Sequence, residues 1–142
     1  MRAGLTIEIE RTPEEVFAFL TDVANLTAWQ SGVRSAEIAG GGGPRAGARI
    51  VESRHLLGRE LETTLEIAEY DPPRLFVLRA LDSPVPFMVR HELEPAAGGT
   101  ALTVVGEGDA GLLPGFAAGI MARRAEKQFR KDFERLKQLL EG

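Results

Sequence analysis

The C-terminal segment, residues 112–141, constrains the fold more than any other part of this chain. It holds one proline, at position 114, and otherwise reads as a single uninterrupted helix. At about 1.5 Å per residue this helix runs roughly 40 Å, far beyond the average helix of a globular protein. Another element has to cover so long a helix, so the remaining residues must supply an extended surface.

One apolar stripe follows this helix at helical spacing. Its members are small at the start and large at the end: Ala118, Ala122, Ala125, Phe129, Phe133, Leu136 and Leu140. A helix that packs on a sheet over its whole length needs large apolar side chains along all of its buried face. The change in size therefore predicts an anchor over residues 129–140 and free space beside residues 112–125, which we interpret as the roof of a ligand cavity.

The first turns of this helix carry two further features. Three glycines, at positions 111, 115 and 119, weaken the helix by roughly 0.5–1 kcal/mol each. They suggest a lid that loosens to admit a ligand, or else the close approach of a neighbouring backbone. The second feature is an apolar set on another side of the helix, Phe116, Ile120 and Met121. Such a segment needs cover from protein, ligand or a dimer partner.

The preceding chain reads as strands with one pair of short helices. Residues 3–11 alternate as a half-buried strand, and Thr12, Pro13 and Glu15 form the start signal of a helix. Asp22 is suited to cap a second short helix ending near Trp29. The remaining strands are expected over residues 33–39, 48–57, 60–68, 75–81, 85–94 and 100–107.

Short connections between these strands imply antiparallel neighbours. The loop at residues 40–44, four glycines and a proline, is interpreted as a flexible hairpin rather than a phosphate cradle, since no Gly-Lys-Ser/Thr follows. We therefore predict an α+β helix-grip fold. A curved antiparallel sheet of about seven strands wraps around the long C-terminal helix, two short helices follow the first strand, and residues 1–142 form a single domain.

Composition excludes several functional classes. Without cysteine the chain has no disulfide, thiolate nucleophile or Cys-based zinc site, and its net charge of −4 argues against general nucleic-acid binding. The absence of a signal-peptide or membrane-spanning run predicts a cytoplasmic protein with no stable membrane insertion.

Residues 123–141 nevertheless hold seven cations and four acids. This excess indicates a solvated helix face or, alternatively, an anionic partner or acidic membrane surface.

Taken together, these patterns resemble the SRPBCC superfamily, which groups START lipid-transfer domains, birch-pollen-allergen-like proteins and polyketide cyclase/dehydrase-like proteins. The resemblance rests on residues 7–9, on residues 12–17 with Leu20, Asp22 and Trp29, and on the strand meander and terminal helix. It covers the whole chain. It implies an internal apolar pocket closed by the long helix, and it supplies no catalytic signature.

His91 is the titratable residue of greatest interest. It shares its strand face with Phe87, Val89 and Leu93, so an imidazole would enter an apolar space if that face is buried. It could then serve as a general acid or base, or simply be a hydrogen-bonded core histidine. Two histidines without a third clustered ligand predict no metal site, and no cofactor is expected.

The neighbouring strands supply further candidates. His55 and Arg54 lie on opposite faces of one strand, and the pattern does not decide which points inward. Arg79 could anchor a ligand carboxylate or polarise a carbonyl, or it could lie in solvent. The predicted ligand-binding set is Trp29, Arg54, His55, Leu65, Arg79, Phe87, Val89, His91, Val104, Phe116, Ile120 and Met121.

Three functional hypotheses follow from these observations. The first is a binding protein for a small apolar or amphipathic molecule of lipid, polyketide or isoprenoid type, acting as a monomer or homodimer. The second is a polyketide cyclase or dehydratase that uses His91, with Arg79 or Arg54 polarising the substrate. The third is a protein-interaction module that docks through the basic helix or the apolar lid.

Overall fold

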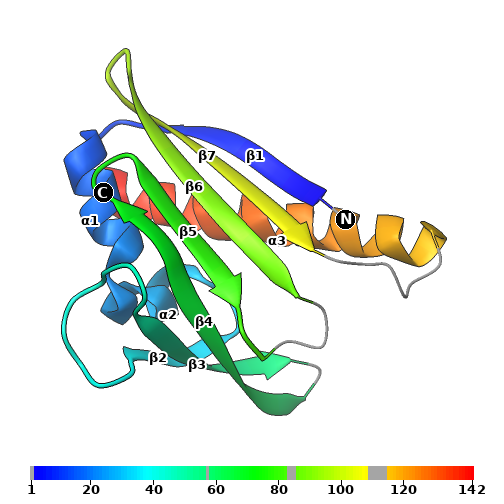
Figure 1. Ribbon diagram of the computed structural model, residues 1–142. Coiled ribbons are helices and arrows are strands. Elements are labelled where there is room, and N and C mark those ends of the chain that lie inside the picture. The colour runs from blue at the N-terminus through cyan, green and yellow to red at the C-terminus, as the bar shows by residue number, and fades with distance from the viewer. Residues whose placement is uncertain (1, 57, 83–85, 109–114) are drawn as a thin grey trace.

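The computed structural model describes residues 2–56, 58–82, 86–108 and 115–142 (Figure 1). Its seven strands form one antiparallel sheet in the order β1-β7-β6-β5-β4-β3-β2. The three α-helices lie on one side of this sheet, with α3 running behind β1 and β7. In chain order the elements are β1 (Arg2–Ile9), α1 (Pro13–Thr21), the 3-10 helix η1 (Val23–Asn25), α2 (Leu26–Trp29), β2 (Val33–Ile38), β3 (Arg49–Leu56), β4 (Arg59–Asp71), β5 (Leu75–Ala80), β6 (Phe87–Ala96), β7 (Gly99–Gly108) and α3 (Gly115–Glu141).

The predicted helix-grip fold is confirmed, with small changes at element ends. β4 continues to Asp71, beyond the predicted end at residue 68, and a register shift between Ile67 and Glu69 interrupts its pairing with β5. This irregularity brings Tyr70 against the rings of Phe17 and Phe76. The predicted positions Leu57, Val85 and 111–114 lie outside the described residues.

The start of α1 follows its predicted signal. The Thr12 hydroxyl oxygen accepts a hydrogen bond from the Glu15 amide at 3.2 Å, while the same hydroxyl donates to the Glu15 carboxylate at 3.1 Å. The Glu15 side chain therefore binds the hydroxyl of Thr12, whereas the capping-box pattern predicts a bond to the backbone N–H of Thr12. Asp22 accepts from the Ala24 amide and begins η1, which leads directly into α2. These caps fix the direction in which the helices cross the sheet.

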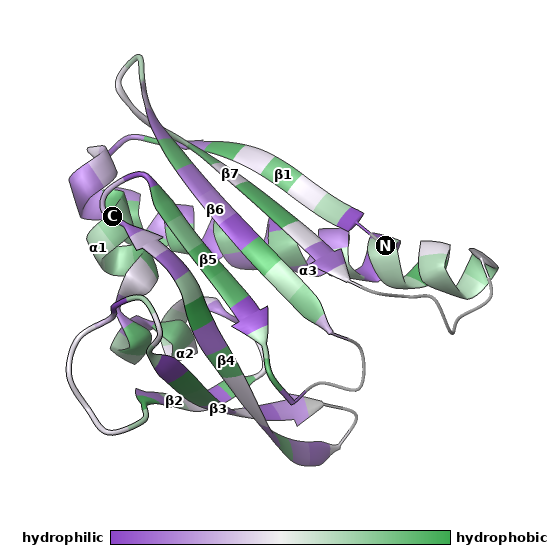
Figure 2. Cartoon of the chain, in the orientation of Figure 1, coloured by the Kyte–Doolittle hydropathy of each residue, from purple (hydrophilic) through white to green (hydrophobic). Residues whose placement is uncertain are grey.

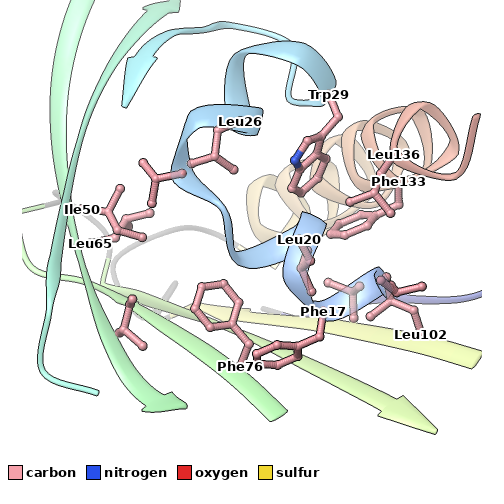
Figure 3. Packing of buried hydrophobic residues seen from close by; sticks show 14 of the residues in the cluster. Phe17, Leu20, Leu26, Trp29, Ile50, Leu65, Phe76, Leu102, Phe133 and Leu136 are labelled. Atoms are coloured by element: carbon pink, nitrogen blue, oxygen red, sulfur yellow. The ribbon is translucent and has the colours of Figure 1, made fainter. Parts of the chain in front are cut away.

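One continuous apolar core fills the space between the sheet and the helices (Figure 3). Green and purple bands alternate along the strands in Figure 2, as expected for a sheet with one face packed and one face wet. Trp29, Phe133 and Leu136 join α2 to α3 on one side of this core. The Phe133 ring lies 5.0 Å from the Trp29 ring, so the anchor of α3 packs directly on the short helix pair.

Polar contacts also fix the C-terminal half of α3. Buried Asp132 accepts hydrogen bonds from the Ser31 amide at 3.1 Å, the Ser31 hydroxyl at 2.9 Å and the Gln128 amide at 2.8 Å. At the last turn, Lys137 donates to the Glu8 carbonyl, and the Glu141 carboxylate accepts from the Glu10 amide. The helix is thus tied to the loop after α2 and to β1.

The first turns of α3 differ sharply from the rest. They extend past the start of β1 at one end of the molecule (Figure 1). Phe116 is 76% exposed, Ile120 and Met121 are also exposed, and nothing lies within 4 Å of a Cβ built on Gly115 or Gly119. These glycines therefore do not serve the close backbone approach that the sequence left open. Among the described residues, no helix is long and apolar enough to span a membrane.

Candidate functional site

A small interior chamber lies between the helix pair and the sheet. It is lined by α1, η1 and α2 on one side and by β3, β4, β5 and β6 on the other, and its volume is about 20 Å³. That volume is close to the space that one water molecule requires. Most of the wall is apolar, but five lining residues carry polar groups: Thr21, Trp29, Gln30, Glu52 and His91. These polar groups make the chamber the candidate site.

His91 lies on the inner face of β6 and is 3% exposed. Its Nδ1 is 2.9 Å from the Phe76 carbonyl oxygen, so Nδ1 carries the proton and donates it there. Burial lowers the pKa of His91 to about 4, although the hydrogen bond to Phe76 opposes that shift. The imidazole is therefore neutral at physiological pH, and its Nε2 carries a lone pair.

The His91 ring is held between two phenylalanines. Its centroid lies 5.3 Å from the Phe76 ring and 5.9 Å from the Phe133 ring. Phe76 comes from the neighbouring strand, whereas Phe133 comes from the anchor of α3. The orientation of this imidazole thus depends on both the sheet and the terminal helix.

Trp29 presents an unusual polar atom to the same interior. The residue is 2% exposed, and its Nε1 has no hydrogen-bond partner among the described residues. Figure 3 shows the indole nitrogen on the side of the ring away from α3, facing the space bounded by Leu20 and Leu26. A buried N–H without an acceptor costs about 1–3 kcal/mol, and native proteins rarely leave one unpaired.

Glu52 is the third polar feature of the chamber. Its side chain, from the inner face of β3, is 1% exposed and lies 3.1 Å from the Arg54 guanidinium. Burial raises the pKa of Glu52, and the charge and hydrogen bond of Arg54 partly offset this rise. Arg54 also donates to the Gln30 side chain at 2.9 Å. The pair therefore bridges β3 to the loop that follows α2.

Several residues predicted from the sequence meet at or near this chamber. Trp29, Leu65 and His91 line it, and Arg54 reaches its edge through Glu52. The inner face of β3 carries Ile50, Glu52 and Arg54, which settles the choice of face that the sequence left open. Phe87, Val89 and Val104 also belong to the core, away from the lining itself.

The remaining predicted residues lie elsewhere. His55 is exposed on the opposite face of β3, and Arg79 is exposed on the outer face of β5, where it pairs with Glu66. Phe116, Ile120 and Met121 are exposed on the first turns of α3 and do not line the chamber. The structure therefore separates these five residues from His91 and Trp29. A ligand contact for any of them remains a prediction.

Three further residues line the chamber that the sequence did not predict as site residues: Glu52, Gln30 and Thr21. A signal for Glu52 was present, because it shares strand phase with Ile50, and a carboxylate at an apolar position is unusual. Thr21 and Gln30 gave no comparable signal, since they lie at the ends of short helices whose packing depends on the whole fold. In the described part of the chain, no three His, Asp or Glu side chains gather closely enough to hold a metal ion.

A larger hollow lies on the surface, apart from the chamber. It has a volume of about 530 Å³ and lies between the start of η1, the end of β2 and the glycine loop at residues 40–44. Asp22 and Glu37 are its charged lining residues. Much of its wall is glycine backbone, which provides few side chains for recognition. The interior chamber, with its buried polar groups, is the better candidate.

Comparisons with known proteins agree with this architecture. Residues 2–141 match the family model described as Polyketide cyclase / dehydrase and lipid transport. None of the curated proteins matches the chain. Similar solved structures include protein CV1439 from Chromobacterium violaceum, with a TM-score of 0.76, 17% identity and coverage of 99% of this chain and 98% of that one.

Two further structures share the fold. The chain is similar to Ara h 8.0201, with a TM-score of 0.71, 17% identity and coverage of 99% of this chain and 97% of that one. It is also similar to BexL, the di-domain ARO/CYC from the BE-7585A biosynthetic pathway, with a TM-score of 0.80 and 19% identity. That alignment covers 97% of this chain and 45% of BexL. The resemblance to the SRPBCC superfamily is confirmed, and the chain belongs to the polyketide cyclase/dehydrase and lipid transport family.

Proposed function

We propose that this protein binds a small amphipathic molecule whose apolar body lies among the core side chains and whose polar group is held beside Trp29. The observation that carries the proposal is the buried indole N–H of Trp29, which belongs to the lining of the chamber and has no hydrogen-bond partner in the part of the chain that the structure describes. A ligand oxygen that accepts this hydrogen bond would remove the cost of leaving the N–H unpaired. The description of the family, which includes lipid transport, supports an apolar class of ligand.

The chamber also indicates what the polar group of the ligand should be. Neutral His91 has one ring nitrogen without a proton, and it lines the same cavity as the indole N–H. A hydroxyl or an enol both accepts and donates, so it would satisfy Trp29 and His91 together. We therefore infer a lipid, polyketide or isoprenoid that carries such a group.

The small volume of the chamber sets a condition on binding. A space of about 20 Å³ holds one water molecule, so a larger ligand must displace side chains of the wall. Leu20 and Leu26 come from the short helices α1 and α2 and form part of this wall. Binding therefore requires repacking between the helix pair and the sheet, and the ligand orders the opened state.

Titration with cis-parinarol, a fluorescent fatty alcohol whose hydroxyl both accepts and donates, tests this proposal. Saturable binding is expected, together with quenching of Trp29, the only tryptophan in the chain. Trp29→Phe removes the N–H and should weaken binding roughly fivefold to tenfold, measured by direct excitation of the probe. Tyr70→Phe is the matched control, because it removes a polar group from an aromatic residue that does not line the chamber. Absence of saturable binding would refute the proposal, as would equal affinity for Trp29→Phe and wild type.

A second candidate function is acid–base catalysis by His91 in a polyketide cyclisation or dehydration. The observation that favours it is the neutral imidazole, whose tautomer is fixed by the hydrogen bond to Phe76 and whose pKa is about 4. Such a ring can accept a proton at Nε2, although its low pKa makes it a weak base. His91→Ala should abolish turnover of a β-polyketone substrate and lower probe affinity far less, by no more than the one hydrogen bond that Nε2 accepts. Unchanged turnover would eliminate this function.

A further inference from the structure

The outward face of α3 carries a pattern that the interior site does not use. Within residues 115–131 of α3, at about 100° per residue, six side chains fall within about 60° of one direction, opposite the stripe that packs on the core. All six are exposed. Going along the helix, they are Phe116, Ile120, Arg123, Arg124, Lys127 and Lys131.

This face has an apolar tip and a cationic stem. The tip consists of Phe116, which is 76% exposed, and Ile120, which is 47% exposed. It lies on the turns that extend beyond the sheet, coloured pale to green in Figure 2. The stem consists of the four cations that follow, from Arg123 to Lys131. None of these four cations forms an ion pair within the described part of the chain.

The local charge differs in sign from that of the whole chain. Residues 115–131 contain five cations and one acid, Glu126, which pairs with Arg130. The chain as a whole carries a net charge of −4. The cations are therefore concentrated on one face next to the exposed apolar tip. This charge distribution points to a partner that is anionic and also offers an apolar phase.

We propose that this face of α3 docks the protein on an anionic lipid surface. Phe116 and Ile120 enter the boundary between headgroups and acyl chains, while Arg123, Arg124, Lys127 and Lys131 lie against the anionic headgroups. Helices that bind in the plane of a membrane interface combine an apolar part with basic residues in this way, and each cation strengthens binding to acidic lipid. The proposal is independent of the interior site.

Charge also argues against the main alternative occupant. A second copy of this chain, joined through the same face, would bring two sets of these cations together, and like charges in contact oppose association. A polyanion without an apolar phase would leave Phe116 and Ile120 in water. A lipid surface satisfies both parts of the face at once.

Co-sedimentation with vesicles tests the proposal. The protein should bind vesicles of phosphatidylglycerol and phosphatidylcholine, bind pure phosphatidylcholine much more weakly, and lose affinity at high salt. The triple variant Arg123→Gln/Arg124→Gln/Lys127→Gln should lose on the order of 100-fold in affinity. Arg34→Gln/Arg49→Gln removes exposed cations from β2 and β3 and should bind as wild type does.

The apolar tip has its own variant and control. Phe116→Ser/Ile120→Ser should weaken vesicle binding at low and at high salt. The control Leu61→Ser/Met88→Ser changes two exposed apolar residues outside α3 and should have no effect on binding. Equal binding to the two vesicle types, or wild-type binding by the triple variant, would overturn the proposal. So would a dimer in sedimentation equilibrium that Phe116→Ser/Ile120→Ser converts to monomer, since a second copy would then occupy this face.

Discussion

The two halves of α3 belong to one helix and yet have opposite surroundings. From Phe129 to Leu140 the apolar stripe packs on the core, and the buried Asp132 binds the loop after α2. From Gly115 to Ala125 the stripe consists of alanines, and the opposite face carries exposed Phe116 and Ile120. The difference follows from side-chain size: phenylalanine and leucine reach across to the sheet and α2, whereas alanine buries little area.

This contrast suggests a division of roles within the helix. The packed half supports the wall of the chamber from outside, since the ring of Phe133 lies against both Trp29 and His91. The exposed half is free to meet a partner without disturbing those contacts. Local stability should therefore change along the helix.

Hydrogen exchange should give the largest difference. Amides in residues 129–140 should exchange only when the whole protein unfolds. Their opening free energy should therefore equal the global free energy of unfolding, on the order of 5–15 kcal/mol. Amides in residues 116–124 should exchange through local fraying at free energies near zero, because few apolar contacts hold those turns. Mass spectrometry of exchanged peptides measures both. Equal protection along the whole helix would remove the distinction and with it the predicted lid.

Phe133→Ala should destabilise the protein by about 3–5 kcal/mol, measured by urea denaturation. The substitution removes a buried ring that packs at 5.0 Å from Trp29 and 5.9 Å from His91, between centroids. Phe116→Ala makes the same chemical change in the exposed half and should alter stability by less than about 0.5 kcal/mol. Similar losses for the two variants would mean that the tip of α3 is packed in solution.

Much of this architecture could be predicted from the sequence, because its signals are local. The alternation of apolar and polar residues identified the strands, and Thr12 and Asp22 identified the starts of the helices. Short connections between the strands implied their antiparallel order. The anchor of α3 was identified by its large apolar residues. The exposure of the first turns could not be predicted, because it depends on where the sheet ends relative to the helix.

Acid should destabilise the protein through His91. Its pKa is lowered from 6.5 to about 4 in the native state, so both states are neutral above pH 6.5. As the pH falls from 6.5 toward 4, the unfolded chain binds a proton that the native state excludes. Stability is therefore lost across that window, by roughly 3 kcal/mol at the acid end.

The contribution of His91 is isolated by measuring the free energy of unfolding of wild type and His91→Gln as a function of pH. Because glutamine does not titrate, this free energy should depend less on pH in the variant than in wild type between pH 6.5 and about 4. Glu52 lines the same chamber, and its raised pKa acts in the opposite sense: it contributes stability at acid pH that is lost as pH rises. Both proteins contain Glu52, so its effect cancels in the difference. Parallel pH profiles for the two proteins would contradict the buried, neutral imidazole.

Asp132→Ala should cost about 1–3 kcal/mol, because the Ser31 amide, the Ser31 hydroxyl and the Gln128 side chain all lose their acceptor. Asp132→Asn keeps one acceptor oxygen and should lose less. Glu126→Ala removes an exposed acid from the same helix and should cost only about 0.3–0.5 kcal/mol. Urea denaturation of the three variants ranks them, and an equal cost for residues 126 and 132 would show that Asp132 does not anchor α3.

The chamber was less predictable than the fold for a physical reason. Strand phase placed His91 correctly, because its neighbours on β6 are apolar on one face only. Arg54 and His55 could not be assigned, since both faces of β3 mix polar and apolar residues. Pairing decides the matter: Ile50 lies opposite Leu65 of β4, which turns Glu52 and Arg54 inward. That information is contained in two strands together and in neither one alone.

Substitutions at two glycines should change stability with opposite signs. Gly106 on β7 lies under the ring of Phe129, and a Cβ there would come within 2.9 Å of that ring, so Gly106→Ala should destabilise by about 1–3 kcal/mol. Gly119 faces open space, so Gly119→Ala should stabilise the local helix by about 0.5–1 kcal/mol.

The place where the Gly119→Ala effect is seen matters as much as its size. If the first turns of α3 open independently of the core, the added stability slows hydrogen exchange of residues 116–124 severalfold and leaves the urea midpoint unchanged. If the helix unfolds as one unit with the core, the midpoint rises instead. Slower exchange with an unchanged midpoint supports two halves of α3 that are separately stable. A raised midpoint contradicts this, because stability added to the exposed turns increases the free energy of global unfolding only if the helix unfolds cooperatively with the core.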